Sequence, residues 1–226
     1  MLCIIDYGIG NLRSIEKALE AVGADVIRSD KPEDIARADR VVLPGVGAFG
    51  ACADEIQKRD LIPSIKQAVA SGKPFLGVCV GMQLLFDVSE EMGLHDGLGI
   101  LPGRIVRFQR SYANVMATAG DLEDEPASGP TKGLKIPHMG WNIASPTRNS
   151  PLLEGLKSPA YFYFVHSFHA VAGNPSDILA ATHYGTDFPS IVQRNNVFGV
   201  QFHPEKSHDN GLLVLKNFVE LPSDYS

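Results

Sequence analysis

Residues 73–86 read KPFLGVCVGMQLLF, a stretch in which an apolar strand pattern ends at Cys79 and a helical pattern begins. Gly77 and Gly81 stand two residues before and two after the cysteine. This spacing is typical of a nucleophile elbow, a strained turn between a strand and a helix. A side chain at either glycine would collide with the crossing strand and helix. The turn would expose the thiol above the edge of a sheet, where the N-terminal dipole of the helix favours the thiolate.

The residues before this stretch alternate short apolar runs with amphipathic segments, a pattern that predicts a parallel sheet covered by helices. Helical spacing is clearest at 11–22, where Asn11 is a plausible N-cap and Gly23 a plausible C-cap. A long helical pattern also separates the apolar run at 41–44 from the strand that precedes Cys79.

After Phe86 the sequence indicates strands with little helix between them, then a final helix from about Gly211 to Glu220. The expected strands are RIVRF (104–108), PHMGWNIA (137–144), AYFYFVHSF (160–168), ILAATHY (178–184), SIVQRN (190–195) and VFGVQF (197–202). The predicted fold class is α/β, with a central, mixed but mostly parallel sheet flanked by helices. Residues 110–133, rich in Ala, Gly, Ser, Asp and Glu without an apolar period, are expected to form a flexible surface loop.

Length and charge limit the classes of function. At 226 residues and 44% hydrophobic content, the chain 1–226 is expected to form a single domain. A net charge of −6, without a cluster of basic residues, argues against nucleic acid as a partner. The N-terminal apolar run stops at Asp6 and no run of about 18 apolar residues occurs, so neither a signal peptide nor a membrane span is predicted. A cytoplasmic protein is expected.

Cysteine and histidine spacing suggests no disulfide framework, metal site or cofactor. The three cysteines are odd in number and widely spaced. Cys3 and Cys52 are interpreted as small buried apolar residues. His166 and His169, three apart on one expected strand, would point to opposite faces. No other pair has ligand spacing with a supporting carboxylate.

The second constellation is VFGVQFHPEKS, residues 197–207, in which a strand leads directly into His203, Pro204 and Glu205. Pro204 favours an extended conformation at His203, and in extended backbone residues i and i+2 project to the same face. A carboxylate beside one ring nitrogen leaves the other to exchange a proton with a thiol. A turn that caps the last helix would also explain these residues. Together with Cys79, however, they form a nucleophile, a base and an orienting carboxylate.

A third motif, VVLPGVGAFG at 41–50, follows a strand with glycines at 45, 47 and 50. Glycines let backbone N–H groups turn outward, so an oxyanion hole is plausible here. The N–H of Val46 or Gly47 would join that of Val80. A turn of this kind can also hold a phosphate or simply reverse the chain, but the Lys-Ser/Thr ending of a nucleotide loop is missing.

The motifs GVCVGMQ, PGVGAFG and FHPEKS, in these relative positions, resemble the class I glutamine amidotransferases over nearly the whole chain. The resemblance implies that family's fold and the hydrolysis of glutamine through a γ-glutamyl thioester. It gives Cys79 the role of nucleophile, His203 that of base and Glu205 that of orienting residue. DYGIGNLRSI, PHMGWN, YFVHSF and the lysine after HPE are similar to the glutaminase subunits of imidazole glycerol phosphate synthases.

That similarity also implies a substrate pocket and a partner. The residues implied to bind glutamine are Gly45, Gly47, Gln83, His166, Ser167 and Phe168. The residues implied to face a separate cyclase subunit, which would receive the ammonia for histidine biosynthesis, are Asn11, His138, Trp141, Asn142, Tyr163 and Lys206. Without the resemblance, PHMGWN would be interpreted as a buried strand with a core tryptophan. Two features depart from the family pattern: the 110–133 loop is longer than usual, and Phe168 stands where a hydroxylated aromatic is commoner.

Three alternatives remain open at this stage. The chain could be the glutaminase of anthranilate, aminodeoxychorismate or pyridoxal phosphate synthesis, a regulatory module without chemistry, or a cysteine hydrolase of peptides. Ammonia released into neutral water would be protonated and lose its nucleophilicity. We therefore expect slow idle hydrolysis, and a PGVG peptide that reorients to complete the oxyanion hole when the ligand-loaded cyclase docks.

Overall fold

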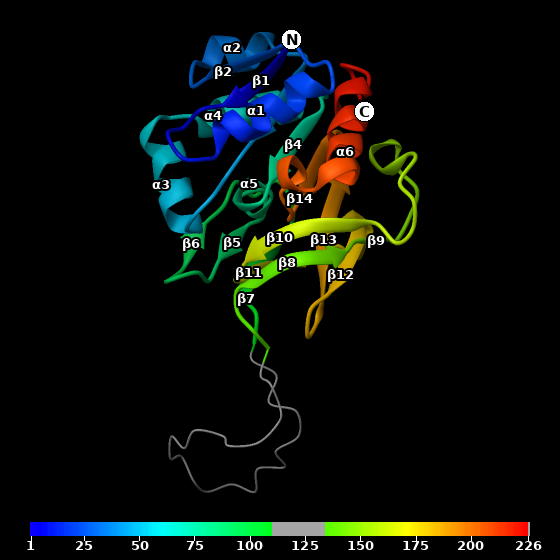
Figure 1. Cartoon of the computed structure of the whole chain (residues 1–226). Helices are drawn as coiled ribbons and strands as arrows, with labels where there is room; N and C mark the ends of the chain where they lie inside the picture. The colour runs from blue at the N-terminus through cyan, green and yellow to red at the C-terminus, as the bar shows by residue number, and fades with distance from the viewer. Residues whose placement is uncertain (110–133, 226) are drawn as a thin grey trace, which may run out of the picture.

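Eight strands form the central sheet of the computed structural model, which describes residues 1–109 and 134–225 (Figure 1). Their order is β2-β1-β3-β4-β14-β13-β12-β9. The first five strands in this order run parallel, and the remaining pairs are antiparallel, so the predicted mixed, mostly parallel sheet is confirmed. The bounds are β1 (Leu2–Ile5), β2 (Val26–Ser29), β3 (Arg40–Leu43), β4 (Phe75–Val78), β9 (Ser145–Pro146), β12 (Ile178–His183), β13 (Asp187–Arg194) and β14 (Val197–Val200).

Helices pack against this sheet, and Figure 1 shows α1 and α6 side by side in front of it. Their bounds are α1 (Leu12–Ala21), α2 (Pro32–Arg37), α3 (Phe49–Lys58), α4 (Ile62–Ala70), α5 (Val80–Gln83) and α6 (His208–Glu220). Three short 3₁₀ turns are η1 (Pro151–Leu153), η2 (Pro175–Asp177) and η3 (Pro204–Lys206). Every helix in these two described stretches is too short or too polar to cross a membrane.

Helix α1 shows how the local sequence sets a boundary. Gly23 adopts φ +91°, its N–H donates to Glu20 O, and the Ala24 N–H donates to Leu19 O. This pair of bonds is a Schellman motif, which confirms Gly23 as the stop. Asn11 occupies the N-cap position, but its side chain makes no capping hydrogen bond.

Three helix predictions need correction. The long pattern before Cys79 is two helices, α3 and α4, separated at Asp60, which has a positive φ, and Leu61. The last helix begins at His208 rather than near Gly211. The helix after Cys79 is only four residues long, so the dipole that it offers the thiol is weaker than the sequence pattern suggested.

Two small sheets lie outside the central one, and they hold several of the strands expected after Phe86. One pairs β10 (Tyr161–His166) with β8 (His138–Ile143). The other has the order β11-β7-β5-β6, comprising β5 (Val88–Ser89), β6 (His95–Asp96), β7 (Gly103–Arg107) and β11 (Phe168–Ala172). The chain leaves one small sheet and enters the other at Ser167. Alternation of apolar residues identifies a strand but not its partner.

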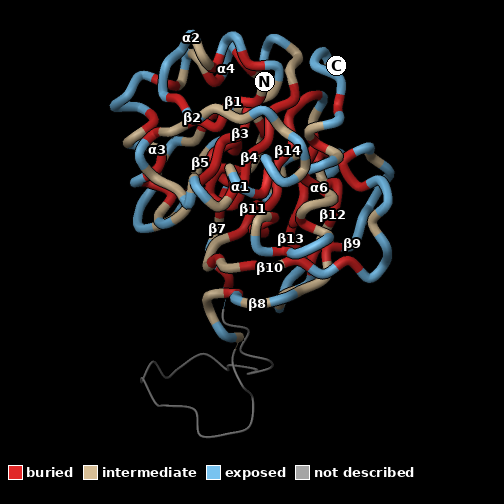
Figure 2. Tube along the Cα trace, turned by 45° about the horizontal axis from the view of Figure 1, so that its top comes forward, coloured by how far each residue is buried: buried red, intermediate tan, exposed pale blue. Residues whose placement is uncertain are grey.

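The core follows the central sheet, where the tube in Figure 2 is almost continuously buried. Strands β1, β4 and β14 are buried at every residue because helices or other strands cover both faces. The carboxyl ends of β3, β4 and β14 therefore form a rigid edge, and the three chemical motifs follow these ends. The predicted loop at 110–133 lies outside the described residues.

Candidate active site

Cys79 occupies the turn between β4 and α5 with φ 55° and ψ −112°, a strained conformation for a residue other than glycine. A Cβ atom at Gly77 would lie 2.6 Å from Gly81 O, and one at Gly81 would lie 1.9 Å from Leu43 O. Both distances are too short for real contacts, which confirms the steric reason for the two glycines. The obstacle at Gly81 is the neighbouring strand β3 rather than β4.

His203 and Glu205 meet directly after β14. The His203 Nδ1 atom lies 2.9 Å from Glu205 Oε1, and the side chains are only 5% and 4% exposed. His203 itself is extended, but Pro204–Lys206 form a 3₁₀ turn, so the contact arises from a turn and not from the fully extended backbone that the sequence predicted. With Nδ1 directed at the carboxylate, Nε2 is the ring nitrogen left for the Cys79 thiol.

The environment of His203 favours its charged form. Burial alone would lower the pKa of the imidazole, but hydrogen bonds to Cys79 and Glu205, and the negative charge of these partners, raise it to about 10. The backbone holds the ring in place, because the His203 N–H donates to Tyr163 O at 2.9 Å and the Ser207 hydroxyl donates to His203 O at 2.6 Å. The structure thus brings the three predicted catalytic residues together, and the arrangement suits transfer of a proton between the sulfur and the ring.

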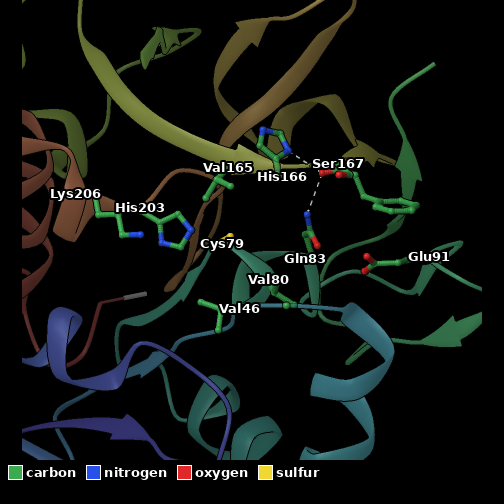
Figure 3. Close-up of a pocket in the computed structure, with 12 residues that line it drawn as sticks. Val46, Cys79, Val80, Gln83, Glu91, Val165, His166, Ser167, His203 and Lys206 are labelled. Atoms are coloured by element: carbon green, nitrogen blue, oxygen red, sulfur yellow. Dashed lines mark hydrogen bonds between the residues drawn. The ribbon is translucent and has the colours of Figure 1, made fainter. Parts of the chain in front are cut away.

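A cavity of about 310 Å³ opens beside the cysteine (Figure 3). The predicted residues that line it are Val46, Gly47, Val80, Gln83, His166, Ser167 and Phe168, with Cys79, His203 and Lys206. Gly45 does not line the cavity. A Cβ atom there would lie 2.6 Å from the Gly81 N, so Gly45 lets the backbone of the PGVG segment lie against the elbow.

Three residues at the site were missed from the sequence. Glu91 and Val165 line the cavity, and Glu91 also accepts a hydrogen bond from the Phe49 N–H at 2.7 Å. Gln201 is fully buried, with its Nε2 4.0 Å from Cys79 Sγ and its Oε1 3.0 Å from Gln83 Nε2. Gln201 stands two residues before His203, so strand alternation could have identified it, whereas Glu91 follows a two-residue strand that leaves no periodic signal.

Three histidines form a buried imidazole cluster (His138, His166 and His169), and all three rings pack on Phe108. The expectation that His166 and His169 point to opposite faces is therefore wrong, because the backbone changes sheets at Ser167 between them. The part of the chain that the structure describes contains no group of three residues suited to hold a metal ion.

Hydrogen bonds in this cluster fix the tautomers. His166 Nδ1 must donate to Phe168 O, 2.8 Å away, because a carbonyl only accepts. His166 Nε2 then accepts from His138 Nδ1 at 2.9 Å, and His138 Nε2 accepts from Asn142 Nδ2 at 3.2 Å. Burial lowers the pKa of His138 to about 4 and that of His166 to about 3, so both rings stay neutral near pH 7.

Most residues implied to face a partner lie at the surface, but His138 does not. Trp141 is 47% exposed and stacks on His208 at 5.1 Å, with Tyr163 packed edge-on at 6.0 Å. The Lys206 Nζ lies 5.9 Å from the centre of the Tyr163 ring. His138 is only 3% exposed. Asn11 is exposed at the start of α1, and Asn142 is half-buried beneath His138.

The chain belongs to the family described as glutamine amidotransferase class-I, whose model matches residues 3–221. Within that class, it is 56% identical over 223 residues to the imidazole glycerol phosphate synthase subunit HisH of Salinibacter ruber, covering 99% of this chain and 95% of the relative. The protein of that name from Syntrophotalea carbinolica is 46% identical over 98% of this chain and 100% of its own length.

Solved structures agree on the fold. PurLQS from Thermotoga maritima matches with a TM-score of 0.66 at 18% identity, covering 96% of each chain. A crystal structure of a glutamine amidotransferase matches with a TM-score of 0.64 at 17% identity, covering 95% of this chain and 98% of that chain. At such low identity these likenesses establish the class I amidotransferase fold alone.

Proposed function

We propose that the chain is the glutaminase subunit of an imidazole glycerol phosphate synthase and passes ammonia to a cyclase subunit for histidine biosynthesis. The observation that carries the chemistry is the buried contact between His203 and Glu205 beside the strained Cys79. The 56% identity to a HisH subunit over nearly the whole chain supports the choice of this synthase over the other glutaminases.

The proposed reaction proceeds through a thioester. The Cys79 sulfur attacks the side-chain amide carbon of glutamine while His203 holds the thiol proton. The amide oxygen gains negative charge, which the N–H groups of Val80 and of Val46 or Gly47 stabilise. His203 then donates its proton to the amide nitrogen, the C–N bond breaks and ammonia leaves. Water, deprotonated by His203, attacks the thioester, the C–S bond breaks, the Cys79 sulfur leaves and takes the proton back from His203, and glutamate is released.

Charged groups around the cavity suit the amino-acid end of glutamine. Glu91 places a carboxylate on the cavity wall, where it can bind the α-ammonium group. Gln83 donates from Nε2 to Phe168 O at 3.0 Å, and the same nitrogen donates to the buried Gln201, which fixes the Gln83 side chain in the cavity wall. The pocket would therefore favour a substrate with a free α-ammonium group, which a residue inside a peptide chain lacks.

The surface next to the cavity suits docking of a partner. On the paired strands β8 and β10, Trp141 lies opposite Tyr163 and Met139 opposite Val165. Trp141 and Met139 are 47% and 61% exposed, an apolar patch of the kind found at protein interfaces. Val165 also lines the cavity, so the patch continues into the proposed active site. A partner seated here would exclude water from the exit of ammonia.

We also propose that residues 1–226 form one domain that acts in the cytoplasm. One continuous cluster of buried apolar side chains runs through both described stretches, which supports a single domain. Asn11 and the other residues implied by the resemblance keep their proposed roles in glutamine binding or partner contact, with His138 acting from the interior through Asn142. Gly45 would serve glutamine binding only indirectly, because it lets the PGVG backbone lie against the elbow.

The proposal is tested by labelling the chain with 6-diazo-5-oxo-norleucine, an electrophilic glutamine analogue, and locating the adduct by mass spectrometry. We expect one adduct on Cys79, protected by glutamine and absent from Cys79→Ala, whereas Cys3→Ala retains it. No glutamine-protected labelling at Cys79 would favour a regulatory module. For the partner, Trp141→Ala should weaken binding of the cyclase subunit by at least about tenfold, since buried aromatic anchors dominate interfaces.

A further inference from the structure

The PGVG segment (Pro44–Gly47) is held by two side chains that have no other assigned role. The Tyr7 hydroxyl donates to Pro44 O at 2.7 Å, and the Cys52 thiol donates to Val46 O at 3.4 Å. Both side chains are fully buried, Tyr7 after β1 and Cys52 in α3, and they also interact with each other. Two parts of the chain that are far apart in sequence thus clamp the segment.

Between the two clamped carbonyls lies the Gly45–Val46 peptide. Neither its carbonyl oxygen nor its N–H has a hydrogen-bond partner within residues 1–109 and 134–225. Gly45 is fixed against the elbow, because a Cβ atom there would meet Gly81 N at 2.6 Å. With its α-carbons and both neighbouring carbonyls fixed, this peptide can rotate about the line joining its α-carbons without displacing the rest of the segment.

We propose that Tyr7 and Cys52 are positioning residues for the oxyanion hole, which fix the peptides on either side so that only the Gly45–Val46 peptide turns. The proposal rests on the glutaminase function above, in which the Val46 N–H binds the developing oxyanion. Burial raises the pKa of Tyr7 and of Cys52, so both groups keep their protons near neutral pH and remain donors.

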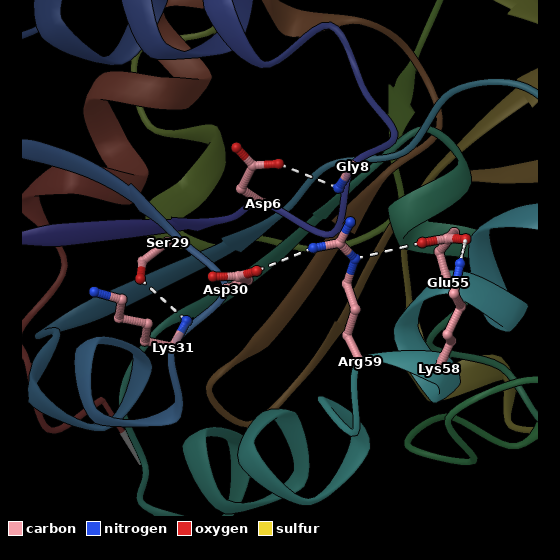
Figure 4. Close-up of polar contacts among 8 residues, drawn as sticks. All are labelled: Asp6, Gly8, Ser29, Asp30, Lys31, Glu55, Lys58 and Arg59. Carbon is pink, nitrogen blue, oxygen red and sulfur yellow. Dashed lines mark hydrogen bonds and ion pairs between the residues drawn. The ribbon is translucent and has the colours of Figure 1, made fainter.

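Tyr7 also connects this clamp with the surface. Tyr7 directly precedes the turn Gly8–Asn11, whose last residue is exposed. A Cβ atom added at Gly10 would lie 3.7 Å from Pro44 Cβ, an ordinary contact distance. Arg59 supports the turn from below: its guanidinium lies against Gly8 and pairs with Asp30 at 3.0 Å and with Glu55 at 3.4 Å (Figure 4). The turn that carries the exposed Asn11 is therefore held in place directly beside the clamp.

The test compares Tyr7→Phe, Cys52→Ala and Cys52→Ser with the wild-type chain, each in complex with the cyclase subunit. Tyr225→Phe and Cys3→Ala, which alter a tyrosine and a buried cysteine away from the cavity, are matched controls. Loss of one clamping hydrogen bond should lower kcat for glutamine by about three- to tenfold at unchanged KM. Cys52→Ser, which can still donate to Val46 O, should recover most of the activity that Cys52→Ala loses.

A second readout separates the oxyanion hole from general damage. Glutamate γ-semialdehyde adds to Cys79 to form a tetrahedral oxyanion, whereas iodoacetamide alkylates the thiol without one. Tyr7→Phe and Cys52→Ala should weaken inhibition by the aldehyde by about three- to tenfold and leave the rate of alkylation within twofold of wild type. If the variants lose as much in alkylation as in aldehyde inhibition, or if they match their controls, the positioning role is overturned. The proposed function is unaffected by that result as long as the wild-type complex releases glutamate. A wild-type complex that releases no glutamate overturns the proposed function and this inference together.

Discussion

Adding one methyl group at Gly81 tests whether the elbow depends on space rather than on backbone freedom. Its Cβ atom would lie 1.9 Å from Leu43 O, where real contacts do not fall below 3.0 Å, so β3 or α5 must move by about 1 Å. The obstacle is a backbone carbonyl at the end of a buried strand and cannot rotate away as a side chain would. We expect Gly81→Ala to lower the free energy of unfolding by about 3 kcal/mol.

For a chain of this length that loss corresponds to a melting temperature lower by about 6 to 12 °C, measured by calorimetry. Movement of α5 should also slow iodoacetamide alkylation of Cys79, because the sulfur leaves its contact with His203. Gly23→Ala is the matched control, because a Cβ atom added there meets no atom within 4 Å. Its only destabilising effect is the strain of placing alanine at φ +91°. A Gly81→Ala melting temperature within 2 °C of wild type, with unchanged alkylation, would refute the steric reasoning.

Three further predictions concern charge. Glu205→Gln removes the carboxylate that helps raise the pKa of His203, so kcat should fall by roughly 100-fold. The pH profile of Cys79 alkylation should also show a lower imidazole pKa, and an unchanged profile contradicts the orienting role. Because burial lowers the pKa values of the imidazole cluster, the unfolded chain binds protons that the folded chain does not, and the free energy of unfolding should fall as pH drops from about 6.5 towards 4. Urea titrations across this range should show a shallower fall for His169→Phe, which keeps an aromatic ring in the cluster. Arg194→Met leaves the Asp177 carboxylate, 5% exposed, without its guanidinium partner and should cost about 3 to 5 kcal/mol in urea unfolding, whereas Lys216→Met, which breaks an exposed pair, should cost less than about 1 kcal/mol.

The sequence was most informative where chemistry and sterics act over a few residues. Gly77 and Gly81 could be predicted as close-packed positions because a nucleophile elbow allows no side chain beside Cys79. The contact between His203 and Glu205 could be predicted because the two residues are only two positions apart in the sequence. Even there the backbone differs, since Pro204 starts a 3₁₀ turn instead of continuing an extended segment.

Features set by long-range pairing could not be predicted in the same way. Strand alternation around Ser167 cannot indicate that the chain passes from one small sheet to another. Glu91 lies between β5 and β6 and is held at the start of α3 by the Phe49 N–H, and such short strands leave no periodic pattern. His138 was expected at the surface, but stacking on Phe164 and Tyr184 places it inside.

The most direct measurement is glutamate release from glutamine by the purified chain, alone and with the cyclase subunit carrying its nucleotide ligand. Cys79→Ala serves as the blank. We predict slow release by the free chain, strong activation in the loaded complex, and no release by the variant in either state. Rapid release by the free chain would contradict gating by the partner, and no release from the loaded complex would contradict the proposed glutaminase itself.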